Sequence, residues 1–117
     1  MKKRLVSVLL CGVITFPALS GQVSIPACDA RSGNATVVLA GVKGKWVGFS
    51  ARAGSGEIID LPPEKVKGFA SFGSGSKIFH FGGNKGVTSV RASTWADFDK
   101  KKNLMEDRKD DSGWVSC

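Results

Sequence analysis

Apolar and polar residues alternate with a period of two along much of the chain after residue 20, and glycine-rich turns separate the alternating segments. This alternation is typical of strands that have one buried and one solvated face. In Lys77–Phe81, for example, Phe79 and Phe81 face one side while Ile78 and His80 face the other. Short strands separated by turns favour antiparallel hairpins. The pattern predicts strands at Thr36–Ala40, Lys45–Ala51, Glu57–Leu61, Lys67–Phe72, Lys77–Phe81, Val87–Ala92 and Trp114–Cys117.

One stretch near the C-terminus departs from this pattern and predicts a helix. Ser93 or Thr94 could cap it, and Asp97 and Asp99 would lie in its first turn, where carboxylates are favoured. Gly113 would end it. Its apolar residues can share one helix face: Trp95, Phe98 and Met105. We therefore expect a mainly β fold, a small antiparallel β-sandwich or sheet with one short C-terminal helix.

The first 20 residues have the organisation of a cleaved signal peptide. A charged start, Met1–Arg4, precedes an apolar run, Leu5–Phe16, and a small-residue segment that ends at Ser20. The run is shorter than the roughly 18 residues that a membrane span needs. We place the cleavage after Ser20, with Gly21 as the fallback, which leaves a single β-rich domain at residues 21–117 in the periplasm. Cys11 lies too deep in the apolar run for a lipoprotein signal, so no membrane anchor is expected.

Removal of the leader leaves two cysteines, Cys28 and Cys117, at opposite ends of the domain. Export delivers the chain to an oxidising compartment, which favours a disulfide over two unrelated thiols. In the chain-entropy description, closing so long a loop contributes roughly 4 to 5 kcal/mol of stability. Two cysteines and a single histidine do not complete the four ligands of a zinc site. We expect no metal and no cofactor.

The charge of the chain favours an acidic partner. Its formal net charge is +7, and removal of the three basic residues of the leader leaves +4. Lysine and arginine dominate between Cys28 and Trp95, whereas both signs nearly cancel between Asp97 and Asp111. The partner could be nucleic acid, an anionic surface polymer or a protein with an acidic cleft, and charge alone does not choose among them. The aromatic residues, three tryptophans and seven phenylalanines, are interpreted as core rather than as a sugar-stacking platform.

Few residues could support catalysis. His80 is the single histidine, and no G-x-S-x-G motif is present, so a serine hydrolase is not indicated. The strongest enzyme alternative is a small secreted ribonuclease or toxin, which needs a base, an acid and cations around a phosphate. The chain contains such residue types: Arg52, Glu57, Lys77, His80 and Arg91. Such a set occurs by chance in a basic protein, and we expect no enzymatic activity.

The segment Ser71–Gly86 has the highest density of candidate binding residues. Two glycine-rich loops, Gly73–Ser76 and Gly82–Gly86, flank a short strand there, and their small side chains would leave narrow spaces accessible. The segment lacks the order of a P-loop, and two ordinary hairpin turns are the alternative interpretation. The residues predicted to contact a target are Ser74, Ser76, Lys77, His80, Asn84 and Lys85.

These elements resemble the periplasmic lysozyme inhibitors of the membrane-bound or periplasmic C-type inhibitor family. The resemblance consists of Cys28, the tetrapeptide Ser74–Lys77, Lys85 with Gly86, and Cys117. In that family a serine loop and a lysine loop plug the cleft of the glycosidase, which the resemblance implies here. The chain departs from the family pattern at Ile78, where the family loop usually has an aromatic residue, in a shorter spacing to Lys85, and in the additional predicted helix.

In size, export signal and lack of catalytic residues, the chain is also similar to periplasmic immunity proteins of type VI secretion systems, which protect against peptidoglycan-cleaving effectors. Both resemblances imply an inhibitor of a cell-wall hydrolase, such as a lysozyme-like muramidase, that inserts loops into the acidic cleft. This is our leading hypothesis, with a protein rather than a nucleic acid as the partner. The alternatives are the ribonuclease or toxin and a module that binds an anionic polymer. We also expect a homodimer, formed through an exposed strand edge or apolar patch.

Overall fold

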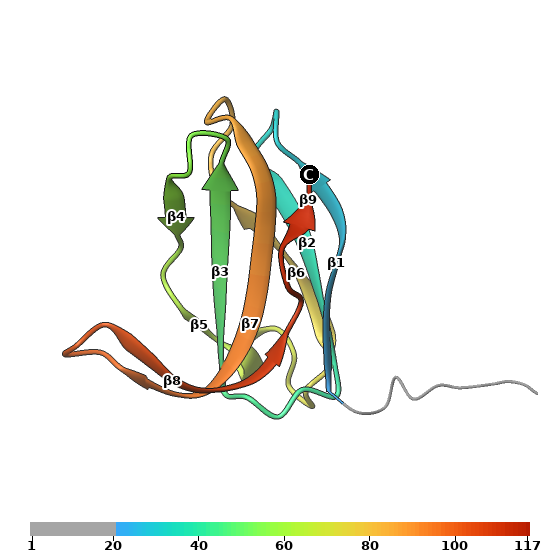
Figure 1. Ribbon diagram of the computed structural model, residues 1–117. Coiled ribbons are helices and arrows are strands. Elements are labelled where there is room, and N and C mark those ends of the chain that lie inside the picture. The colour runs from blue at the N-terminus through green and yellow to red at the C-terminus, as the bar shows by residue number, and fades with distance from the viewer. Residues whose placement is uncertain (1–20) are drawn as a thin grey trace, which may run out of the picture.

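A computed structural model describes residues 21–117; the predicted signal peptide, residues 1–20, lies outside them. The described chain forms two antiparallel sheets that pack face to face (Figure 1). The smaller sheet has the order β1-β2-β6, and the larger has the order β4-β3-β7-β8, with β5 also paired to β3 and β9 to β7. The strands are β1 (Gln22–Asp29), β2 (Asn34–Ala40), β3 (Trp46–Ala53), β4 (Ile58–Asp60), β5 (Glu64–Lys65), β6 (Gly75–His80), β7 (Val87–Asp99), β8 (Leu104–Asp111) and β9 (Val115–Ser116).

The core lies between the two sheets and is formed by alternate residues of the strands. Phe49 of β3 stacks on Phe79 of β6, with ring centroids 5.1 Å apart and an interplanar angle of 4°. Phe81 also stacks on Phe49, with ring centroids 6.0 Å apart. As the alternation predicts, Phe79 and Phe81 are buried, whereas Ile78 and His80 are exposed. The mainly β sandwich predicted from the sequence is therefore confirmed.

Different contacts join the two sheets at their two edges. On one side, the predicted disulfide is present: Cys28 of β1 bonds to Cys117, directly after β9, and the two Cα atoms are 4.9 Å apart. On the other side, Lys77 of β6 forms an ion pair with Glu64 of β5. The covalent bond and the ion pair thus hold opposite edges of the sandwich, and the disulfide spans 89 residues of sequence.

The predicted C-terminal helix is wrong, because its residues form the β7–β8 hairpin. Phe98 and Met105, which we placed on one helix face, are partners across the two strands. Asp99 does not face a helix N-terminus but caps the hairpin turn, since its carboxylate accepts the backbone N–H groups of Lys101 and Lys102 at 3.0 and 3.3 Å. Asn103 ends the turn with a positive φ of 51°, a conformation that asparagine tolerates.

Two further differences concern strands. The predicted strand Lys67–Phe72 is instead a short 3-10 helix, Val66–Gly68, followed by a turn, because Val66 and Ala70 are both buried and the Ala70 N–H donates to the Val66 carbonyl at 2.7 Å. Strand β1 was not predicted because Pro26 interrupts its pattern. Pro26 lies at a bulge, between the pairs Ser24↔Val38 and Ala27↔Thr36, where a missing N–H is tolerated. The other predicted strands coincide with β2, β3, β4, β6, the first part of β7, and β9.

We expect the double variant Cys28→Ser/Cys117→Ser to lose roughly 4 to 5 kcal/mol of unfolding free energy, because the unfolded chain is no longer restricted by the long closed loop. Urea denaturation of protein purified after secretion measures this loss. A thiol titration of the unreduced parent protein serves as the control and should detect almost no free thiol. A loss of less than about 1 kcal/mol would contradict the bridging role of this bond.

Candidate functional site

The predicted target-binding residues lie along β6 and at both of its ends. Ser74 precedes the strand, and its hydroxyl accepts the backbone N–H of Gly41 at 2.9 Å, which ties the loop to the end of β2. Ser76 is exposed on β6. Lys77 is half-buried by its ion pair with Glu64, and its ammonium group also lies 5.5 Å from the ring centroid of Phe79. Ser74 and Lys77 are therefore already engaged in contacts within the protein.

The remaining predicted residues lie toward the other end of β6. The His80 ring bonds through Nδ1 to the side-chain oxygen of Asn34 on β2. Asn84 and Lys85 are exposed in the following loop, where Asn84 has a positive φ of 59°. The two glycine-rich loops are thus separated by the length of β6, about 17 Å at the usual rise per residue. A single narrow cleft in a target would therefore receive only one of these loops at a time. The role of the loops in target binding stays a prediction.

The residues of the ribonuclease alternative do not form one site. His80 points outward from the smaller sheet, whereas Arg91 points outward from the larger sheet, on the opposite side of the sandwich. Within residues 21–117, no cluster of three or more histidine, cysteine, aspartate or glutamate side chains is arranged to hold a metal ion. In the same part of the chain, no helix has the length and apolar character needed to cross a bilayer.

The outer face of the larger sheet carries a groove that the sequence analysis did not predict. Its floor is formed by the small residues Gly48, Ser50 and Ser93, and its volume is about 630 Å³. This volume falls within the range of roughly 300–1,000 Å³ found for ligand sites. We call this feature the outer groove. Its sides are formed by the β7–β8 hairpin and by the segment 60–63 after β4; its principal side chains are Asp60, Arg91, Trp95, Phe98, Arg108 and Trp114.

A glycine in β3 makes room for the indole of Trp95 in the outer groove. A Cβ added at Gly48 would lie 3.4 Å from Trp95 Nε1 and 3.7 Å from the terminal methyl group of Met105. A larger side chain would therefore displace both residues. Beside them, the ring of Trp46 packs edge-to-face on Phe98, with centroids 5.2 Å apart. The missing side chain at Gly48 lets these residues lie across the sheet.

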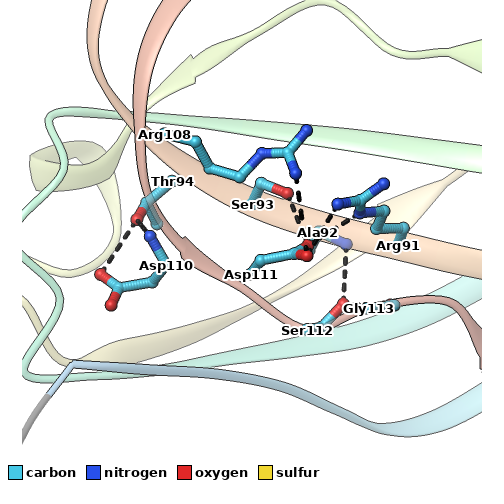
Figure 2. Close-up of polar contacts among 9 residues, drawn as sticks. All are labelled: Arg91, Ala92, Ser93, Thr94, Arg108, Asp110, Asp111, Ser112 and Gly113. Carbon is cyan, nitrogen blue, oxygen red and sulfur yellow. Dashed lines mark hydrogen bonds and ion pairs between the residues drawn. The ribbon is translucent and has the colours of Figure 1, made fainter.

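Polar side chains converge on Asp111 along the groove (Figure 2). The guanidinium of Arg91 donates from Nε and Nη2 to the two carboxylate oxygens at 2.8 and 2.7 Å, and the Ser93 hydroxyl donates to one of them at 2.8 Å. Arg108 Nη1 lies farther away, at 3.9 Å. Hydrogen bonding from Arg91 holds the pKa of Asp111 well below its usual value; partial burial opposes this, and Ser93 adds to it. The same contact raises the pKa of Arg91.

Two arginines lie over two tryptophans near opposite ends of the sheet face. The guanidinium carbon of Arg52 is 4.3 Å from the ring centroid of Trp114, and that of Arg108 is 4.8 Å from the ring centroid of Trp95. Arg52 and Trp95 lie six residue pairs apart along the β3–β7 ladder, which corresponds to about 20 Å. The outer face therefore presents two cation–aromatic pairs, with the Arg91–Asp111 pair between them.

A bulge directs the β7–β8 hairpin away from the body of the sandwich. Thr94 pairs with Asp110 and Trp95 pairs with Arg108, so Lys109 is an additional residue on β8. Bulges bend and twist the strand that contains them. Figure 1 shows the hairpin projecting beyond the sheets. Its turn carries consecutive exposed lysines: Lys100, Lys101 and Lys102.

Comparisons with protein-family models, curated proteins and solved structures find no match for this chain. The site is therefore interpreted from its own geometry. The alternation of apolar and polar residues that predicted the core also contained the sequence signal for the outer groove. In β3, Trp46 shares a face with Gly48, Ser50 and Arg52, so it belongs to the polar side of the strand. The interpretation of the aromatics as core is correct for Phe49, Phe79 and Phe81. It is wrong for Phe72, which is 95% exposed, and for the tryptophans, which are partly exposed.

We expect the stabilisation from Asp111 to depend on pH. Its folded-state pKa is below the ordinary value of 3.8, so the unfolded state takes up the proton first as the pH falls. The contribution is fully present above about pH 5 and is lost as the pH falls through the folded-state pKa. Urea denaturation should show that Asp111→Asn is less stable than the parent at pH 7, and that this gap narrows steadily from about pH 5 to pH 2.

Asp107→Asn is the matched control for this experiment. It removes a carboxylate whose side chain is 60% exposed and, within residues 21–117, forms an ion pair with Lys109 alone, a contact that contributes little to stability. Asparagine also tolerates the positive φ of 62° at this position. The gap between Asp107→Asn and the parent should stay small at every pH. A gap for Asp111→Asn that is constant from pH 7 to pH 2 would contradict the role assigned to the Arg91 contact.

Proposed function

We propose that this protein is a periplasmic inhibitor or immunity protein that blocks a peptidoglycan-degrading glycoside hydrolase, such as a muramidase effector. The observation that carries the proposal is the projecting β7–β8 hairpin with Lys100–Lys102 at its tip (Figure 1). Glycoside hydrolases of this type hold two carboxylic residues in a cleft, and one of them is ionised in the resting enzyme. A narrow element with three cations at its end is complementary to such a cleft in shape and charge.

The hairpin is held in a defined conformation before it meets a partner. The Asp99 carboxylate binds two backbone N–H groups of the turn, and Phe98, one residue pair from the turn, packs against Trp46 of β3. An element that is already ordered loses less conformational entropy when it binds. The lysine side chains at the tip are exposed, so their charge acts on an approaching partner mainly by raising the association rate. The resemblances to lysozyme inhibitors and immunity proteins support the same class of target.

The hairpin differs from the element that the resemblance implied. The loops at the two ends of β6 contain Ser74 and Lys85, and Lys77 between them pairs with Glu64. We therefore assign the insertion to the hairpin and keep the β6 residues as the competing location. The two locations can be distinguished by substitution, because the hairpin tip and β6 share no residue.

Inhibition should be measured against a panel that contains a C-type lysozyme and bacterial muramidase effectors. For the enzyme that the parent protein blocks, Lys100→Gln/Lys101→Gln/Lys102→Gln should lower the association rate about 10-fold or more at low salt, because electrostatic steering is lost. The matched control is Lys43→Gln/Lys45→Gln/Lys67→Gln, which removes the same charge from exposed positions elsewhere. Its association rate should stay within about 2-fold of the parent rate.

A third variant, Lys77→Ala/His80→Ala/Lys85→Ala, tests the competing location. If this variant loses inhibition while the hairpin variant retains it, the interface lies on β6 and the hairpin assignment is wrong. Equal losses in the hairpin and control variants would show an effect of net charge only. No inhibition of any enzyme by the parent protein would end the proposal.

A further inference from the structure

The exposure of the tryptophans points to a second binding surface, separate from the hairpin tip. All three are partly exposed, and none belongs to the buried core of the described chain. Trp46 and Trp95 are cross-strand partners on β3 and β7, and Trp114 lies toward the other end of the outer groove. Indole rings contribute large apolar contact areas when they are covered. Their gathering on one grooved face indicates an interaction site.

The arginines at this face are oriented for carboxylates. A guanidinium group carries its N–H donors in its own plane, so stacking on an aromatic ring leaves those donors free at the edge. The guanidinium of Arg108 lies over the ring of Trp95, its side chain is 43% exposed, and its contact with Asp111 is long, at 3.9 Å. The guanidinium of Arg52 lies over the ring of Trp114. Arg91, in contrast, already donates from Nε and Nη2 to the two carboxylate oxygens of Asp111.

The groove also contains acceptors that suit hydroxyl groups. The carboxylate of Asp60 lies on the wall opposite the hairpin, where one oxygen accepts the Ser50 hydroxyl at 2.5 Å, and Asn103 lines the hairpin side. A carboxylate has about four acceptor positions, so Asp60 can bind further donors. The floor of small residues leaves space for rings to lie flat. We propose that the outer groove binds an extended oligosaccharide that carries carboxylates, with Arg108 and Arg52 binding the acid groups.

Other linear anions fit this groove less well. Both floor strands are paired on both sides, β3 with β4, β5 and β7, and β7 with β3, β8 and β9. An acidic peptide lying on this floor would therefore find no free strand edge there for its backbone groups. A nucleic acid has a higher density of negative charge than such a glycan, so Asp60 would repel it more strongly. A sugar chain has no backbone amides that require pairing, and its hydroxyls can donate to Asp60. This inference is independent of the proposed inhibition.

Binding can be measured by tryptophan fluorescence and calorimetry with defined probes. We expect binding of hexagalacturonate, or of a glycan strand of alternating N-acetylglucosamine and N-acetylmuramic acid freed of peptide; comparison of the two identifies the source of the carboxylate. Arg108→Gln should weaken this binding about 10-fold or more, because a charge-assisted hydrogen bond is lost. Arg31→Gln is the matched control, since Arg31 is exposed in the β1–β2 turn, outside the groove. Its affinity should equal that of the parent.

Neutral chitohexaose, poly-L-glutamate and oligothymidylate complete the comparison and should bind at least about 10-fold more weakly. Binding of chitohexaose as tight as that of the acidic sugars would overturn the assignment of carboxylate recognition. Equal binding of poly-L-glutamate or oligothymidylate would overturn the assignment to sugars, as would no binding of either acidic glycan. If Arg108→Gln and Arg31→Gln lowered the glycan affinity equally, the binding site would lie outside the groove. The variant Lys100→Gln/Lys101→Gln/Lys102→Gln should still bind the glycan, which separates this inference from the proposed inhibition.

Discussion

The antiparallel pairing of β3 with β7 is the constraint on which the rest of the structure depends. Its register, from Trp46↔Trp95 to Ala53↔Val87, places one set of side chains in the core and the alternate set in the outer groove. Because successive residues of a strand face opposite sides, a shift by one residue would exchange these two sets. A shift of β3 alone would turn Phe49 toward solvent, and a shift of β7 alone would turn Trp95 into the core. One ladder therefore determines both the packing of the sandwich and the composition of its candidate binding face.

The polar residues near the end of β8 extend this ordering to the hairpin. Asp110 and Asp111 are neighbours in sequence but serve opposite faces of the sheet. The backbone N–H of Asp110 donates to the hydroxyl of buried Thr94, and that hydroxyl donates to the Asp110 carboxylate, each at 3.1 Å. Asp111 binds Arg91 and Ser93 on the outer face. Asp110 and Asp111 thus attach the end of β8 to the body through both faces of the sheet, next to the bulge at Lys109. The bulge, rather than a loose connection, accounts for the projection of the hairpin.

The parts of the fold that local patterns determine could be predicted from the sequence. Alternation placed Phe79 and Phe81 in the core, and the predicted removal of Cys11 with a leader left Cys28 and Cys117 as the expected pair. The hairpin could not be distinguished from a helix in this way, because Phe98 and Met105 are compatible with both. Phe98 and Met105 pair with each other, in a continuation of β7 beyond its ladder with β3. That ladder, which fixes β7 as a strand, is formed with residues some 50 positions earlier in the sequence. The groove was missed for the same reason, since it brings together residues of β3, β7 and the C-terminal segment.

The disulfide acts at a position that connects it to the outer groove. Trp114 lies three residues before Cys117, and the strand between them, β9, pairs with β7 through Ser116 and Val115. So short a ladder holds a chain end weakly by itself, because the ends of a chain fray unless they are tied down. The covalent bond to Cys28 therefore fixes the indole that closes one end of the groove. Formation of the disulfide thus completes the outer groove as well as the fold, and in a chain that is still reduced one end of the groove is not anchored.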